Sequence, residues 1–120
     1  MLLEGREAVV TSEIARLELA SAVRAASAAR RLRSETGLLG RMDADLGEGG
    51  RVATIALHAE TILPAAYRLI VDHRLRTLDA IHLAVCAEEC PTLSPDGDII
   101  FVTRDKDQAI AARALGFDVR

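Results

Sequence analysis

Three carboxylates that are far apart in the sequence stand at positions from which they could share a divalent metal ion. Glu18 and Asp79 lie near the starts of expected helices, and Asp105 directly follows an expected strand. Mg²⁺ is a small, hard cation that takes oxygen ligands, usually one or two carboxylates together with water and a substrate phosphate. We therefore expect Glu18, Asp79 and Asp105 to be metal ligands.

Each of these carboxylates also has a structural explanation. Glu18 could be an exposed helix residue, although a glutamate buried among small apolar residues would need a compensating cation. Asp79 lies in a first helical turn, where an acid complements the helix dipole. Asp105 and Gln108 have the spacing of a capping box, in which Gln108 would reach back to the Asp105 amide. Capping and metal binding are compatible, and Asp107 is a weaker candidate that we expect to point to solvent.

A second set of potential ligands, His82, Cys86 and Cys90, shares one face of an expected helix. Eight helical residues rise about 12 Å, whereas bonds from zinc to its ligands are about 2.0 to 2.3 Å long. The two ends of this set cannot reach one ion, so we interpret the three residues as core residues and expect reduced thiols. Motifs for nucleophilic catalysis, such as a serine elbow, are absent from the sequence.

The elements that must position the acids alternate between strands and helices. Strands are expected at residues 8–10, 52–57, 98–103 and 117–119, and helices at 12–37, 38–46, 62–73, 77–89 and 106–115. We expect Ser12 and Thr77 to cap helices, Pro64 to lie in a first turn, and Gly37 and Gly116 to end helices. Residues 52–57 form a continuous apolar run, which is typical of a parallel strand covered on both faces. The alternation predicts an α/β fold in which ligands gather at the carboxyl ends of parallel strands.

The composition is that of one globular domain spanning residues 1–120. Half of the residues are hydrophobic and the formal net charge is −3, which argues against a protein that coats nucleic acid nonspecifically. One stretch is locally basic and could either contact phosphates or be a solvated helix flank. Its arginines are Arg24, Arg30, Arg31, Arg33 and Arg41. We expect a cytoplasmic protein without membrane contact, because no apolar run reaches the roughly 20 residues of a membrane span.

Taken together, these segments resemble the PIN-domain ribonucleases, in particular the VapC-type toxins of bacterial toxin–antitoxin pairs. The resemblance covers the whole chain and depends on Ala15-Arg16-Leu17-Glu18, Leu78-Asp79-Ala80-Ile81-His82-Leu83-Ala84 and Phe101-Val102-Thr103-Arg104-Asp105. It implies a PIN-like three-layer domain with a parallel sheet flanked by helices. It also implies a Mg²⁺- or Mn²⁺-dependent endoribonuclease, with Glu18, Asp79 and Asp105 as catalytic metal ligands. A homodimer and a small cognate antitoxin are the partners it implies.

The chain departs from this family at its beginning. Family members start with a central strand that ends in a metal-binding aspartate, and here residues 1–4 are similar to the end of the helix that follows that strand. We therefore expect this first strand to be missing, which leaves an alternative: a noncatalytic, truncated remnant that binds the antitoxin. A third hypothesis, a phosphoacceptor receiver domain, has only Thr103 and Lys106 in its favour.

Overall fold

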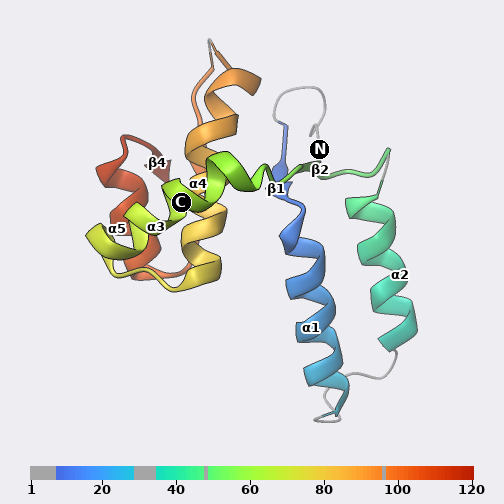
Figure 1. Ribbon diagram of the computed structural model, residues 1–120. Helices are drawn as coiled ribbons and strands as arrows, with labels where there is room; N and C mark the ends of the chain where they lie inside the picture. The colour runs from blue at the N-terminus through green and yellow to red at the C-terminus, as the bar shows by residue number, and fades with distance from the viewer. Residues whose placement is uncertain (1–7, 29–34, 48, 96) are drawn as a thin grey trace. The chain divides into compact units, whose positions relative to one another are not determined.

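The computed structural model describes residues 8–28, 35–47, 49–95 and 97–120, and the chain divides into two units, Met1–Ala56 and Leu57–Arg120 (Figure 1). The described residues form five helices and four short strands. The predicted α/β class is therefore confirmed. Within the described ranges, no helix combines the length and the apolar character needed to cross a bilayer.

The described residues of the first unit form two helices and one pair of parallel strands. Its elements are β1 (Val10–Ser12), α1 (Ile14–Ala28), α2 (Glu35–Leu46) and β2 (Ala53–Ile55). In the ladder, Val10 lies opposite Ala53 and Ser12 opposite Ile55, which confirms the parallel pairing predicted for the apolar run. An exposed ion pair joins the two helices, with Arg16 Nη2 lying 2.6 Å from Asp43 Oδ1. Exposed pairs of this kind add only about 0 to 1 kcal/mol of stability.

Three sequence-based expectations for the first unit are wrong. Ser12 is the last residue of β1, and Glu13 separates it from α1, so Ser12 does not occupy the capping position. Gly37 lies inside α2 instead of ending a helix, a placement that costs only about 1 kcal/mol relative to alanine. Ala53 and Thr54 in β2 are exposed, so this strand is not covered on both faces.

Some predictions for this unit lie outside the described residues. These are the helix end expected at residues 1–4, residues 29–34 of the helix expected at 12–37, and the three central arginines of the basic stretch, Arg30, Arg31 and Arg33.

The second unit packs three helices and a second pair of parallel strands. Its elements are α3 (Ala59–His73), α4 (Thr77–Leu93), β3 (Ile100–Phe101), α5 (Lys106–Ala114) and β4 (Asp118–Val119). The core lies chiefly between α3 and α4, and its largest fully buried side chains are Ile62, Leu83 and Val85. Gly116, with a φ of 95°, follows α5, which confirms the predicted helix end.

Two of the three prolines lie inside helices, although Pro64 is expected in a first turn and Pro91 beyond the helix expected at residues 77–89. α3 begins at Ala59, because the His58 carbonyl accepts the amides of Thr61 at 3.0 Å and Ile62 at 2.9 Å. Pro64 therefore lies beyond the first turn, and Pro91 lies inside α4, which continues to Leu93. Both prolines are exposed, so water can reach the carbonyls that lose a helical partner.

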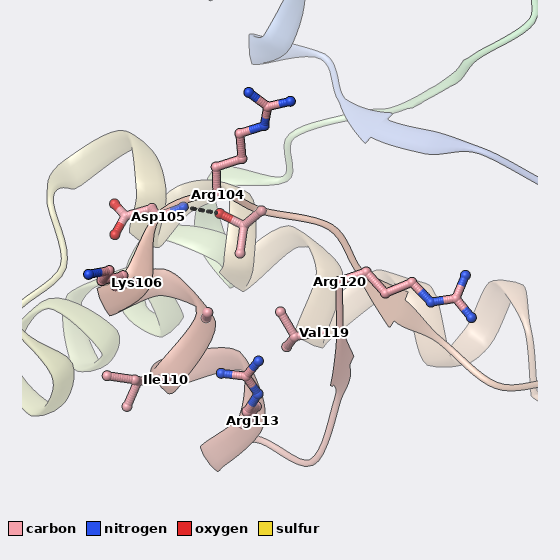
Figure 2. A pocket seen from close by; sticks show the side chains of 9 residues that line it. Arg104, Asp105, Lys106, Ile110, Arg113, Val119 and Arg120 are labelled. Carbon is pink, nitrogen blue, oxygen red and sulfur yellow. Dashed lines mark hydrogen bonds between the residues drawn. The ribbon is translucent and has the colours of Figure 1, made fainter.

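The β3–β4 ladder continues into the loop that precedes α5. Phe101 lies opposite Val119 in this parallel pair, and Figure 2 shows β4 running beside α5. The Arg120 amide donates to the Phe101 carbonyl at 3.0 Å, and the Arg120 carbonyl accepts the Thr103 amide at 2.9 Å. The regular strand is shorter than the predicted 98–103, but its backbone bonds extend to Thr103.

Candidate functional site

Asp105 is the N-cap of α5. Its backbone is extended, with φ −80° and ψ 124°, and its Oδ1 accepts the amide of Asp107 at 2.9 Å and that of Gln108 at 3.4 Å. The capping role predicted for Asp105 is confirmed. These two bonds fix the orientation of the carboxyl group, so that its second oxygen, Oδ2, faces Arg76.

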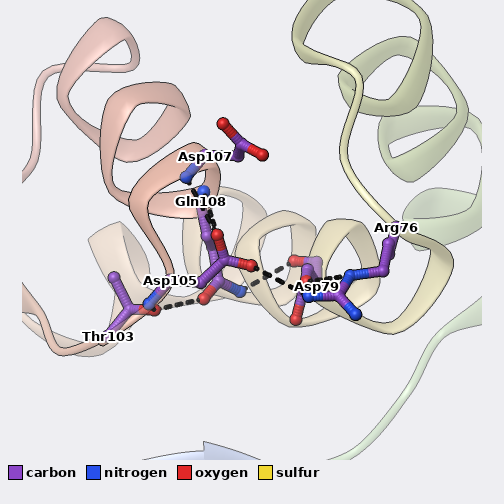
Figure 3. A network of polar contacts seen from close by, with 6 residues as sticks. All are labelled: Arg76, Asp79, Thr103, Asp105, Asp107 and Gln108. Carbon is purple, nitrogen blue, oxygen red and sulfur yellow. Dashed lines mark hydrogen bonds and ion pairs between the residues drawn. The ribbon is translucent and has the colours of Figure 1, made fainter.

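Gln108 does not complete the predicted capping box. Its Oε1 accepts the Thr103 hydroxyl at 2.6 Å, and its Nε2 donates to the Asp79 carbonyl at 3.0 Å (Figure 3). The Asp105 amide donates to the Thr103 hydroxyl oxygen at 3.1 Å instead. Gln108 is buried, and it ties the loop after β3 and the first turn of α5 to the first turn of α4.

This network brings Asp79 and Asp105 together. Asp79, in the first turn of α4, and Asp105, at the start of α5, have side chains that are 27% and 26% exposed. Arg76 reaches both: its Nε lies 3.7 Å from Asp79 Oδ2, and its Nη2 lies 3.8 Å from Asp105 Oδ2 (Figure 3). Two of the three acids predicted for the site therefore lie side by side in the second unit.

The surroundings of Asp105 favour its ionised form. The Gln108 amide lowers the pKa of the Asp105 carboxyl, burial opposes this, and the Asp107 amide, a side-chain hydrogen bond with Asp79 and the Arg76 charge lower it further. Asp105 is thus a carboxylate at neutral pH. A hydrogen bond between two carboxyl groups requires a proton on one of them, and a bound cation would take the place of that proton.

The donor chemistry of the pair fits Mg²⁺ or Mn²⁺. Both ions favour carboxylate oxygens, and Mg²⁺ commonly binds one or two carboxylates while keeping several waters. Within the described ranges, no group of three or more histidine, cysteine or acidic side chains is arranged to hold a metal ion. Asp79 and Asp105 could therefore supply two oxygen ligands, and further ligands would come from water and substrate.

The other predicted acids lie elsewhere. Glu18 is half-buried on α1 in the first unit, so its membership of the site stays a prediction. Asp107 is exposed, as predicted, and its carboxylate points away from Asp105 in Figure 3. Its contribution to the site is made by its backbone amide, which binds Asp105.

The cysteines of α4 belong to the core. Cys86 and Cys90 are both buried, free thiols one turn apart, which confirms their interpretation as core residues. A side-chain hydrogen bond between them raises the pKa of Cys86 and lowers that of Cys90.

No family model, curated protein or solved structure matches the chain. Its function must therefore be argued from its own residues. The strongest observation is the juxtaposition of Asp79 and Asp105 beside Arg76.

Proposed function

We propose that this chain is a metal-dependent endoribonuclease that hydrolyses RNA phosphodiester bonds, similar to the VapC-type toxins of the PIN-domain family. The observation that supports this most is the pair of acids Asp79 and Asp105. They lie at the starts of two helices, and both are next to the Arg76 guanidinium. The proposal includes the finer fold expected from the resemblance: one PIN-like three-layer domain over residues 1–120, with a parallel sheet flanked by helices.

In this proposal, Asp79 and Asp105 are ligands of Mg²⁺ or Mn²⁺, and Glu18 is a third ligand. When bound, the ion supplies an activated water and positive charge that offsets the charge developing on the phosphate. The contribution of the protein is orientation: the N-cap bonds hold Asp105, and Gln108 holds the backbone of Asp79 in register with Thr103. Pre-organised ligands of this kind need no rearrangement during the reaction.

The partners and location in the proposal follow from the resemblance. They are an RNA substrate, a second copy of the chain, and a small cognate antitoxin that covers the acid pair, in the cytoplasm.

One observation favours the alternative function, a noncatalytic module that binds an antitoxin. Arg76 already places a positive charge 3.7 Å from Asp79 and 3.8 Å from Asp105, so the pair is partly neutralised by the protein itself. A pair of acids whose charges are balanced by an arginine can have a purely structural role. Titration calorimetry with Mn²⁺ separates the two functions, because a noncatalytic module should give no saturable heat.

RNA cleavage by the purified protein tests the proposal. We expect Mn²⁺-dependent cleavage that stops on addition of EDTA and falls by at least about 10- to 100-fold in Asp79→Asn. That is the loss typical when a residue supporting a metal ligand is removed, and a ligand itself should cost no less. Asp72→Asn is the matched control, because Asp72 is an exposed acid on α3. Absence of Mn²⁺-dependent cleavage in the wild type, or equal activity of the two variants, would reject the proposal.

A further inference from the structure

A basic groove lies beside the acid pair in the second unit. It has a volume of about 380 Å³ and is formed by α5, β4 and the loop before α5. Four cationic residues line it: Arg104, Lys106, Arg113 and Arg120. Figure 2 shows the Arg113 guanidinium between Ile110 and Val119, with Arg104 and Arg120 extending outward at the edge. The groove thus combines an apolar floor with a cationic border.

The positive charges of this groove are not neutralised by neighbouring acids. Asp105 is the one acid in its lining, and it is engaged with the α5 amides and Arg76. Among the residues that the structure describes, no carboxylate forms an ion pair with Arg104, Lys106 or Arg113, and the same holds for Arg120. Solvent ions therefore share in compensating these charges, and a polyanion would release them on binding.

The apolar floor favours a single-stranded ligand over a duplex. Ile110 is 61% exposed although it lies between cationic side chains. A single strand can direct its phosphates to the cations while an unpaired base or a ribose covers Ile110, whereas a duplex keeps its bases stacked inside. A peptide of Asp and Glu alone would match the charges but brings no flat apolar group to the floor.

The groove and the acid pair share Asp105. This residue lines the groove and also lies beside Arg76 and Asp79. A strand lying in the groove would consequently pass next to both carboxylates.

We propose that the groove formed by α5 and β4 binds the phosphodiester backbone of a single-stranded nucleic acid, which is RNA in the proposed function. The nucleotides bound in the groove are next to those that lie at Asp79 and Asp105. This inference rests on the proposed function and adds to it the surface that holds the substrate. Phosphate contacts of this kind position a strand without reading its sequence.

Fluorescence anisotropy in EDTA tests binding separately from cleavage. The probes are a labelled single-stranded RNA 12-mer, the DNA strand of the same sequence and unlabelled polyglutamate as competitor. The groove variant is R104E/R113E, and the control variant R51E/R68E makes the same charge change at two exposed arginines that do not line the groove. All four arginines are exposed, so the core is unchanged, and equal melting temperatures of the two variants verify this.

We expect R104E/R113E to weaken RNA binding at least about tenfold and to lower the slope of log K against log salt by about 1.4, since each phosphate contact to a single strand contributes about 0.7. Groove-dependent binding of the DNA strand would also support the inference. Equal losses in the two variants, an unchanged salt slope, no RNA binding by the wild type, or groove-dependent binding of polyglutamate alone would overturn it.

The outcome for the groove is distinguishable from the outcome for the proposed function. If RNA binds through the groove and no Mn²⁺-dependent cleavage occurs, the groove stands and the endoribonuclease proposal fails. If cleavage depends on Asp79 while R104E/R113E leaves KM unchanged, the endoribonuclease proposal stands and the groove fails.

Discussion

Gln108 is the side chain on which the arrangement of the acids depends. It accepts a hydrogen bond from Thr103 and donates one to the backbone of Asp79, 29 residues away in the sequence. Because Asp105 caps the same helix, a shift of Gln108 changes the position of Asp79 relative to Asp105. Gln108 is thus a positioning residue for the pair.

Replacement of this side chain should destabilise the second unit. In Gln108→Leu, the Thr103 hydroxyl loses its acceptor and the Asp79 carbonyl loses one of its donors in a partly buried place, which costs about 0.5 to 1.5 kcal/mol for each hydrogen bond. Urea unfolding followed by circular dichroism measures the loss. Glu88→Gln, on the exposed side of α4, should stay within about 0.5 kcal/mol. Equal unfolding midpoints for the two variants would contradict the role assigned to Gln108.

The sequence predicts the positions of Asp79 and Asp105 at helix starts better than it predicts what surrounds them. Asp79 and Asp105 were found because acids at helix starts have a recognisable spacing. The roles of Arg76 and Gln108 were missed, since each depends on the packing of α4 against α5, which no local pattern encodes. A glutamine among the alanines of the closing helix was the available signal for Gln108.

The helices were predicted well in their middles and poorly at their ends. The helical pattern predicts Ala66 and Leu69 on the inward face of α3, and Leu83 and Val85 in a well-buried α4, and all four side chains are buried. The predicted helix ends are wrong near Pro64, Pro91 and Gly37. Proline is expected only in a first turn or outside a helix, and glycine at a helix end, but all three residues lie inside helices. Backbone bonds and exposure decide such cases, because an exposed carbonyl can bond to water instead of to the next turn.

The α4 helix offers a direct comparison of a buried and an exposed leucine. Leu83 is fully buried against the rest of the second unit, whereas Leu93 is 60% exposed at the end of the helix. We expect Leu83→Ala to lower the free energy of unfolding by about 2 to 5 kcal/mol, because it removes buried methyl groups and leaves a cavity. Leu93→Ala should lower it by less than about 1 kcal/mol. Similar losses in chemical denaturation would show that α4 packs differently.

For the protein taken as a whole, the proposed metal binding predicts that Mn²⁺ stabilises the folded chain. A ligand that binds only the folded chain stabilises it by about 2.7 kcal/mol at one hundred times its Kd. Mn²⁺ should therefore raise the melting temperature of the wild type and leave that of Asp79→Asn unchanged. Arg76→Ala should show a larger increase than the wild type at the same Mn²⁺ concentration, because Arg76 competes with the ion for both carboxylates.

Arg68→Ala is the control for this measurement, since Arg68 is an exposed arginine on α3. Scanning calorimetry at several Mn²⁺ concentrations gives the melting temperatures of the wild type, Asp79→Asn, Arg76→Ala and Arg68→Ala. An increase in Arg76→Ala no larger than in Arg68→Ala would mean that the ion binds away from the acid pair.

The backbone hydrogen bonds of Arg120 join two segments that are separated in the sequence. Through Phe101 and Thr103, they connect the last strand to the segment that carries Asp105. If β4 separated from β3, this segment would lose its two hydrogen bonds to Arg120. The distance between the Asp79 and Asp105 carboxyl groups would then vary more. β4 can therefore stabilise the position of Asp105 relative to Asp79, although it contributes no acid to the site.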